Sequence, residues 1–245
     1  MSGLSATRAA ALCCMVAVVE AVAAEDAAPS PSPLPSWLIF SGAEATGRVA
    51  NGWIGADYAP GGIDRSGLRL RGTASAGGYR TSHPDDSATD ITVRKQTATL
   101  AAGYGWITPS RRTALFVGGE VDAREPDHPA VPSSDRGTHW GVAIAGELWA
   151  APSPLVQVMA SASYGSARAS WALRAAVCGR IAGVCLGPET AAVGDAAGSE
   201  FRFGLGLTGL SVGPFETRLA AGVADDAEGD ADTSAYGLVS MWRRF

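Results

Sequence analysis

The side chains best suited to hydrolytic chemistry gather in a few polar segments of this sequence. An aspartate that orients a histidine beside a serine is the arrangement of a serine hydrolase. The residues concerned are His83, His128 and His139, with Asp85, Asp86, Asp127, Ser133 and Ser134. Such combinations arise readily in segments rich in serine and aspartate, and the chain has no phosphate loop or H-E-x-x-H motif. The sequence therefore predicts a protein without catalytic residues, and a hydrolase built on these segments is the alternative.

A second group of candidates consists of charged side chains of both signs that share one face of predicted strands. Lipid would exclude them, so in a membrane barrel they must face the lumen. They are Arg69, Arg71, Glu120, Asp122, Glu147, Arg174, Glu189, Arg202, Glu216 and Arg218, together with Glu44 and Asp57. One interpretation is a polar conduit or a binding site whose side chains hydrogen-bond a ligand. The other is a salt-bridge network that fills the barrel and closes it.

Cys178 and Cys185 are the cysteines that lie outside the amino-terminal segment. Both are expected to point inward, on strands that flank a short turn over residues 179–184, so we predict a disulfide across that hairpin. Buried free thiols are the alternative. Two thiols without a nearby histidine offer too few ligands for zinc. No metal site or cofactor is predicted.

The elements that must position these residues are β-strands, because side chains alternate with period two through most of the chain. Phe201, Phe203 and Leu205, for example, alternate with Arg202 and Gly204. A helix would scatter these side chains around its axis, and glycine would be costly in its interior. The same alternation recurs over residues 68–71, 115–122, 140–148 and 215–223.

The connections between these strands are of two kinds. Short ones with turn chemistry cover residues 60–64, 109–112, 152–154, 179–184 and 211–214. Longer, mostly acidic ones cover residues 81–90, 124–138 and 225–232. Outer-membrane barrels have short periplasmic turns and long extracellular loops. We therefore predict an all-β fold, a closed antiparallel transmembrane barrel of about 12 strands that begins near Trp37. A single long strand within residues 166–199 would make ten, and the first connection, near Gly47, has no strong turn signal.

Both ends of the chain support this prediction. Arg8, the apolar residues 9–19 and the alanines up to Ala24 resemble a signal peptide over residues 1–24. A linker rich in proline, alanine and serine follows over residues 25–35, and residues 36–245 form the predicted barrel. At the other end, residues 234–245 alternate as a strand that ends on Phe245. An aromatic carboxyl terminus resembles the closing strand that the barrel-assembly machinery recognises, so Phe245 is the predicted assembly signal.

Aromatic residues near the predicted strand ends resemble the girdles at the two membrane interfaces. They are Tyr58, Tyr104, Trp106, Trp140, Tyr164, Trp171 and Phe215. The net charge of −5 and the absence of a basic patch exclude nucleic acid as a partner.

Several segments together are similar to a known family, the bacterial cellulose-biosynthesis protein BcsS. They are the glycine-rich residues 55–71 (GADYAPGGIDRSGLRLR), residues 186–189 (LGPE), residues 221–226 (AGVADD) and the Tyr-Gly pair at residues 236–237. Their order and spacing carry the resemblance, which spans roughly residues 40–245. It implies an outer-membrane barrel that is accessory to cellulose production, without assigned catalytic residues, and that exports or anchors the polysaccharide.

We therefore predict a non-enzymatic barrel of the bacterial outer membrane that serves cellulose or exopolysaccharide biosynthesis. The expected partners are outer-membrane lipid, the barrel-assembly machinery, cellulose or another glucan, and subunits of the cellulose-synthase complex. Two alternatives remain. One is an outer-membrane hydrolase with its site on the extracellular loops. The other is a soluble periplasmic β-barrel or β-sandwich that binds a ligand.

Overall fold

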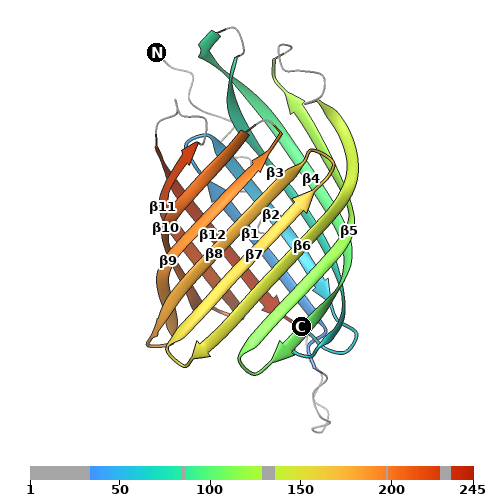
Figure 1. Ribbon diagram of the computed structural model, residues 1–245, viewed down its shortest axis with the longest axis vertical. Helices are drawn as coiled ribbons and strands as arrows, with labels where there is room; N and C mark the ends of the chain where they lie inside the picture. Colours follow the sequence, from blue (N-terminus) through green and yellow to red (C-terminus); the bar gives the residue numbers. More distant parts are fainter. Residues whose placement is uncertain (1–33, 84–85, 129–135, 197, 227–232) are drawn as a thin grey trace. The chain divides into compact units, whose positions relative to one another are not determined.

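Twelve antiparallel strands follow one another along the chain, and each pairs with the next to form a closed barrel (Figure 1). The computed structural model describes residues 34–83, 86–128, 136–196, 198–226 and 233–245, with the backbone alone for Asp226 and for those of residues 81–90. The predicted signal peptide, 1–24, and the predicted linker, 25–35, as far as residue 33 lie outside these residues. The strands are β1 (Trp37–Ala45), β2 (Val49–Tyr58), β3 (Gly67–His83), β4 (Asp86–Thr108), β5 (Arg111–Pro126), β6 (Gly137–Ser153), β7 (Val156–Gly165), β8 (Ser170–Ile181), β9 (Val184–Asp195), β10 (Gly198–Val212), β11 (Phe215–Asp226) and β12 (Ser234–Arg244).

The barrel closes where the last strand pairs with the first. Residues of β12 pair with β1 from Leu38 opposite Arg244 to Ala45 opposite Gly237. The terminal Phe245 extends this seam, because its amide donates to the carbonyl of Trp37 at 2.9 Å and its carbonyl accepts from the amide of Trp37 at 3.0 Å. The prediction of a closed antiparallel barrel is confirmed, with 12 strands rather than ten.

Side-chain alternation divides every wall into an apolar exterior and a polar interior. In β10, Phe201, Phe203 and Leu205 are 53%, 63% and 59% exposed on the outside, whereas Arg202 between them is 2% exposed. A closed sheet satisfies its own backbone hydrogen bonds, so an exterior of this kind suits a lipid environment. Within the described residues there is no helix long and apolar enough to cross a membrane.

The interior wall also holds apolar side chains where glycine leaves room for them. The ring of Trp53 lies over Gly42, where an added Cβ would overlap the ring, and it packs against a cluster of Ala220, Ala224, Tyr236 and Leu238. A side chain at Gly42 would displace this tryptophan. The lumen is therefore lined by rings as well as by charges.

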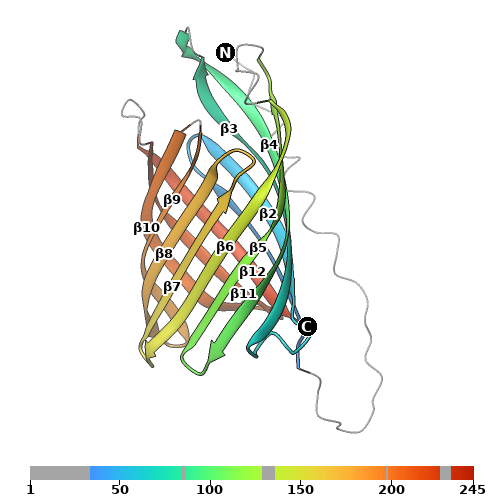
Figure 2. The same ribbon diagram turned by 45° about the vertical axis from the view of Figure 1, so that its right-hand side comes forward.

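Two of the predicted loops, over residues 81–90 and 124–138, are shorter in the structure than expected, because the flanking strands extend into them. Residues 81–83 and 86–90, expected to form a loop, continue the ladder of β3 and β4, with Thr81 opposite Ile91. Likewise β5 runs to Pro126 and β6 begins at Gly137, inside the segment expected as a loop. The β3–β4 hairpin extends past the neighbouring strands in both views (Figures 1 and 2). The sequence of these stretches is polar at successive positions and lacks the alternation of the other strand segments, and the pattern therefore resembled a loop.

The two ambiguous regions resolve into regular hairpins. Residues 166–199 hold β8, β9 and the start of β10, which accounts for the twelve strands. The first connection lies at residues 46–48, as predicted near Gly47. The hydroxyl of Thr46 accepts hydrogen bonds from the amides of Arg48 and Val49 at 3.3 and 3.1 Å. Thr46 is thus the turn signal that the sequence carried, in a form weaker than glycine or proline.

Candidate functional site: the charged lumen

The ten charged residues predicted to face the lumen lie on the inward side of their strands. The structure brings eight of them together in three groups that differ in their distance from the short turns. Arg71 and Glu147 meet near the short-turn end, and Glu120 and Asp122 lie near the opposite end. Four of the ten form a central group: Arg174, Glu189, Arg202 and Arg218.

Glu189 of β9 is the hub of the central group. Its carboxylate accepts a hydrogen bond from Arg174 of β8 at 2.6 Å and another from Arg218 of β11, and Arg174 also donates to the hydroxyl of Tyr236 at 2.8 Å. Charge-assisted bonds of this kind are stronger than neutral ones. Since the Glu189 side chain is 2% exposed, these partners replace nearly all of its hydration.

Glu44 of β1 connects this hub across the barrel. Its Oε2 lies 3.0 Å from Nη2 of Arg174 and 2.8 Å from Nη1 of Arg202, and Arg202 is also paired with Glu200 at 2.5 Å. Four strands separate β8 from β1 around the wall. These ion pairs therefore run through the lumen rather than along the sheet.

Arg71 of β3 organises the group near the short turns. Its guanidinium contacts both carboxylate oxygens of Asp57 at 2.6 and 2.7 Å and both of Glu147 at 2.5 and 2.9 Å. The same guanidinium lies 3.9 Å from the centroid of the Phe116 ring, a cation–π contact. Arg71 thus links β2, β3 and β6 and crosses β5 inside the barrel.

Two of the predicted residues stand apart from these groups. Arg69 donates to the carbonyl of Ile63 at 2.8 Å and so tethers the β2–β3 turn. Glu216 lies 3.6 Å from Arg244 near the barrel seam, where both side chains are substantially exposed.

Arg124 of β5 joins opposite walls at the end away from the short turns. Its guanidinium is 3.0 Å from Asp122, 2.6 Å from Asp195 of β9 and 3.1 Å from the hydroxyl of Tyr79. Three strands lie between β5 and β9. The β7–β8 turn adds to this group, because the amide of Ala167 donates to Glu120 at 2.8 Å.

Exposure within the lumen changes from one end to the other. Near the short turns, the side chains of Glu147 and Glu216 are each 46% exposed, and Arg112 and Arg244 are each 38% exposed. At the other end, Arg124, Asp122, Arg168 and Asp195 are 1%, 3%, 5% and 16% exposed, and Lys95 reaches 29%. Among the described residues, the exposed charged side chains of the lumen hence lie near the short turns, where Asp57 and Arg71 are nevertheless buried (3% and 11% exposed), and the opposite end is mostly packed.

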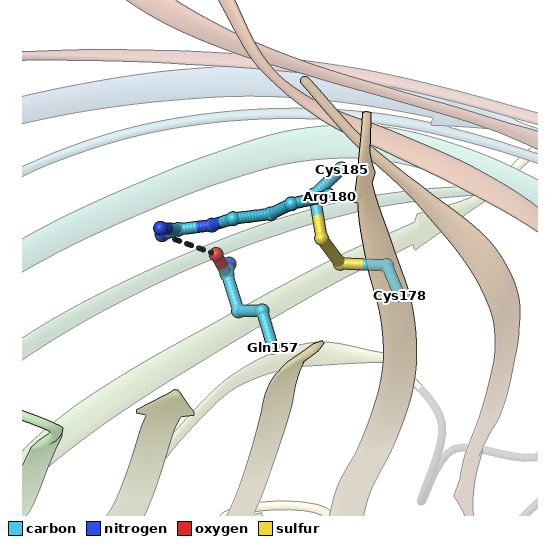
Figure 3. Close-up of a disulfide and its surroundings, with 4 residues drawn as sticks. All are labelled: Gln157, Cys178, Arg180 and Cys185. Carbon is cyan, nitrogen blue, oxygen red and sulfur yellow. Dashed lines mark hydrogen bonds between the residues drawn. A yellow bond between two sulfur atoms is a disulfide. The ribbon is translucent and has the colours of Figure 1, made fainter. Parts of the chain in front are cut away.

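The predicted disulfide between Cys178 and Cys185 is present. It joins β8 and β9 near their shared turn, with the two Cα atoms 5.4 Å apart, and both residues are buried on the inner wall. Figure 3 shows it beside Arg180, whose guanidinium donates to Gln157 at 3.3 Å. The bond closes only a seven-residue separation within an already paired hairpin, so its role is to fix that hairpin.

Replacing both Cys178 and Cys185 with serine is expected to lower the free energy of unfolding by about 2 kcal/mol, as loop-closure entropy gives for so short a loop. Urea titration of the folded barrel, followed by its mobility on a gel, measures this loss. Alkylation of the unfolded, unreduced wild-type protein should leave both cysteines unmodified, and labelled Cys178 or Cys185 in peptide maps would contradict the assignment.

The barrel corresponds closely to one family of proteins. A family model described as "Cellulose biosynthesis protein BcsS" matches residues 38–245. The chain belongs to the BcsS family. The matched range begins in β1 and ends on the terminal Phe245, so the whole BcsS barrel is covered. None of the curated proteins matches the chain.

Solved structures similar to this BcsS-family chain are bacterial barrels of very different sequence. LpxR from Salmonella typhimurium has a TM-score of 0.50 at 13% identity, covering 86% of this chain and 100% of that one. The translocator domain of the autotransporter NalP from Neisseria meningitidis has a TM-score of 0.45 at 11% identity, covering 86% and 88%. The KdgM porin has a TM-score of 0.45 at 9% identity, covering 85% and 99%. At such identities the likeness concerns the fold alone.

The residues considered for hydrolysis are not assembled into a catalytic group within the described part of the BcsS barrel. The carboxylate of Asp127 accepts a hydrogen bond from the amide of Thr92 at 3.0 Å. His139 lies opposite Asp122 in the β5–β6 ladder, but that carboxylate is paired with Arg124. Asp85, Ser133 and Ser134 lie outside the described residues, as do the side chains of His83 and Asp86. Within the part of the chain that the structure describes, there is no cluster of three or more metal-binding side chains.

Sequence reasoning missed several members of the lumen network. Arg124 fell inside an expected loop, and Tyr236 and Glu200 lie on strands whose other members were assigned. The inward position of Tyr236 follows from the alternation of β12, where Tyr236 and Leu238 are buried and Val239 and Met241 are exposed. The contacts of Arg124 with Asp195 and of Tyr236 with Arg174 join distant strands and leave no signal in the local sequence.

Proposed function

We propose that this protein is a non-enzymatic barrel of the bacterial outer membrane that serves the biosynthesis of cellulose or a related exopolysaccharide. Membership of the BcsS family supports the process, and the apolar exterior supports the membrane location. Leu100, Ile144 and Phe203 are more than half exposed on that exterior. An apolar band of this kind would be an aggregation hazard on a soluble periplasmic protein.

In the orientation typical of bacterial barrels, the short turns face the periplasm and the opposite end faces outward. Phe245 then lies at the periplasmic end of the seam, paired with Trp37, with its ring 4.4 Å from the Arg243 guanidinium. This position suits a signal that the barrel-assembly machinery reads before the seam closes. The water-accessible end of the lumen faces the periplasm, and the packed end faces the medium.

The asymmetry of the lumen favours anchoring over export. A glucan chain leaving through this barrel would have to break the buried pairs of Arg124 and those of Glu44, which cross the lumen. Glu147, Glu216 and Arg112 instead offer exposed charges to the periplasm, where they can hydrogen-bond glucan hydroxyls without making or breaking a covalent bond. The difference in side-chain exposure between the two ends of the lumen is the observation that supports anchoring over export. Cellulose-synthase subunits are the expected partners.

Deletion of the gene is expected to leave total glucan synthesis intact and to release cellulose from the cell surface into the medium. The measurement compares cell-bound and released glucan in wild-type, deleted and complemented strains. A strain that lacks the protein and makes no extracellular glucan would favour export, and unchanged binding to the cells would contradict a role in cellulose anchoring. Complementation with Glu147→Gln and Glu216→Gln together tests the periplasmic lumen directly, since both side chains are exposed and their loss should spare the fold.

A further inference from the structure

A groove on the outer wall of the barrel, outside the lumen, has no part in the proposed function. It lies on β4 and β5 beside their short turn and has a volume of about 470 Å³. It is a shallow groove, open to the outside along the wall, and not an enclosed pocket. Its lining residues are Trp106, Thr108, Arg111, Thr113 and Leu115.

Side chains along this groove change character in steps toward the turn. Tyr104 is paired with Leu115, Trp106 with Thr113, and Thr108 with Arg111. The wall therefore passes from an aliphatic and aromatic layer, through an indole and a hydroxyl, to a hydroxyl and a guanidinium. A phospholipid has the same order, from acyl chain through the ester region to the phosphate, and aromatic rings favour the middle layer.

Arg111 is oriented for an anion. Its Nε donates to the hydroxyl of Thr113 at 3.0 Å, and within the described residues no carboxylate is paired with its guanidinium. Its neighbour Arg112 points the opposite way, into the lumen, and is paired with Asp64 at 2.7 Å. The terminal nitrogens of Arg111 thus remain available to hydrogen-bond a phosphate at the end of the apolar groove.

We propose that this groove binds one phospholipid of the surrounding leaflet, with its phosphate on Arg111 and an acyl chain against Trp106 and Leu115. The proposal rests on the membrane location given above, and it adds a specific lipid site to the uniform apolar band. Thr113 flanks the guanidinium and places a further hydroxyl donor beside the phosphate, while Thr108 donates its hydroxyl to the carbonyl of Arg111 at 3.3 Å and so fixes the turn. The lipid would lie across the paired strands β4 and β5 near their short turn, at the edge of the membrane.

Native mass spectrometry of the full-length protein, extracted from membranes in mild detergent, tests the site. Wild-type protein should retain one phospholipid, and Arg111→Gln should weaken its retention by about 10-fold, the effect of losing a charge-assisted hydrogen bond. Arg243→Gln is the matched control, because Arg243 is also at the short-turn end and outward but lies over Phe245. Arg111→Lys should restore most of the retention.

Three outcomes would count against a phospholipid site in this groove. Equal loss of lipid in Arg111→Gln and Arg243→Gln, or full retention in Arg111→Gln, would overturn the groove as a site. Inorganic phosphate that displaces the lipid at millimolar concentration would show an anion site without lipid specificity and would overturn it too. Migration of each unheated variant as a folded barrel, and its presence in outer-membrane fractions, are measured in parallel. A wild-type protein that neither migrates as a folded barrel nor occurs in outer-membrane fractions would refute the membrane location itself.

Discussion

Replacing Glu189 with alanine is expected to lower the free energy of unfolding by about 3–5 kcal/mol, as the removal of one partner from a buried ion pair does. The carboxylate is 2% exposed and serves Arg174, Arg218 and Tyr236 together. Its loss leaves two arginines facing one another in the lumen without the charge between them. Urea titration of the folded, lipid-embedded barrel, followed by gel mobility, measures the effect.

Glu147→Ala is the matched control for this substitution. Its side chain is 46% exposed, and Arg71 keeps both of its contacts with Asp57 when Glu147 is removed. We expect a loss of less than about 1 kcal/mol, as for solvent-exposed pairs. Equal losses at positions 189 and 147 would show that the central group does not hold the barrel together.

Replacing Arg124 with alanine is expected to make the barrel leaky. Arg124 connects β5 to β9 through Asp195, and it also bonds Asp122 and the hydroxyl of Tyr79. Without it, the end away from the short turns loses this link between opposite walls, and water can reach the carboxylates that it neutralised. The pairs of Glu44 with Arg174 and Arg202 still cross the lumen, so we expect passage of small solutes only. Liposomes that contain the variant should swell in solutions of small sugars, while wild-type liposomes should not.

Arg112→Ala is a suitable control for Arg124→Ala, since both remove a lumen arginine. Arg112 pairs with Asp64 at the short-turn end, where the lumen is already open. Its loss should not change the swelling rate. Equal swelling rates for liposomes with Arg112→Ala and with Arg124→Ala would contradict the claim that the residues around Arg124 close the lumen. An absence of swelling with both variants would contradict it too.

The direction of many lumen side chains could be predicted from the sequence, because alternation along a strand is a local property. Arg202 between Phe201 and Phe203 is one example, and the paired cysteines are another. Strand number followed from the alternation of short and long connections. These features depend on residues that are neighbours in the chain.

Contacts across the lumen could not be predicted in the same way. Arg174 meets Glu44 over a separation of 130 residues, and the stagger of all intervening strands decides whether they reach one another. The polar first residues of β4, 86–90, were mistaken for a loop, because no alternation between apolar and polar residues is visible there. Arg124 was missed for the same reason, although it proves to be a connecting residue of the outer group.

The central claim is that the lumen of this BcsS-family barrel is packed, in its described residues, at the end away from the short turns and therefore does not conduct cellulose. Conductance across a planar lipid bilayer containing the purified wild-type protein tests this most directly, with Arg124→Ala as the positive control. The structure predicts no steady open-channel current for the wild-type barrel and stepwise currents for the variant. A stable open conductance of the wild-type protein would contradict the claim and would make the lumen a route for export.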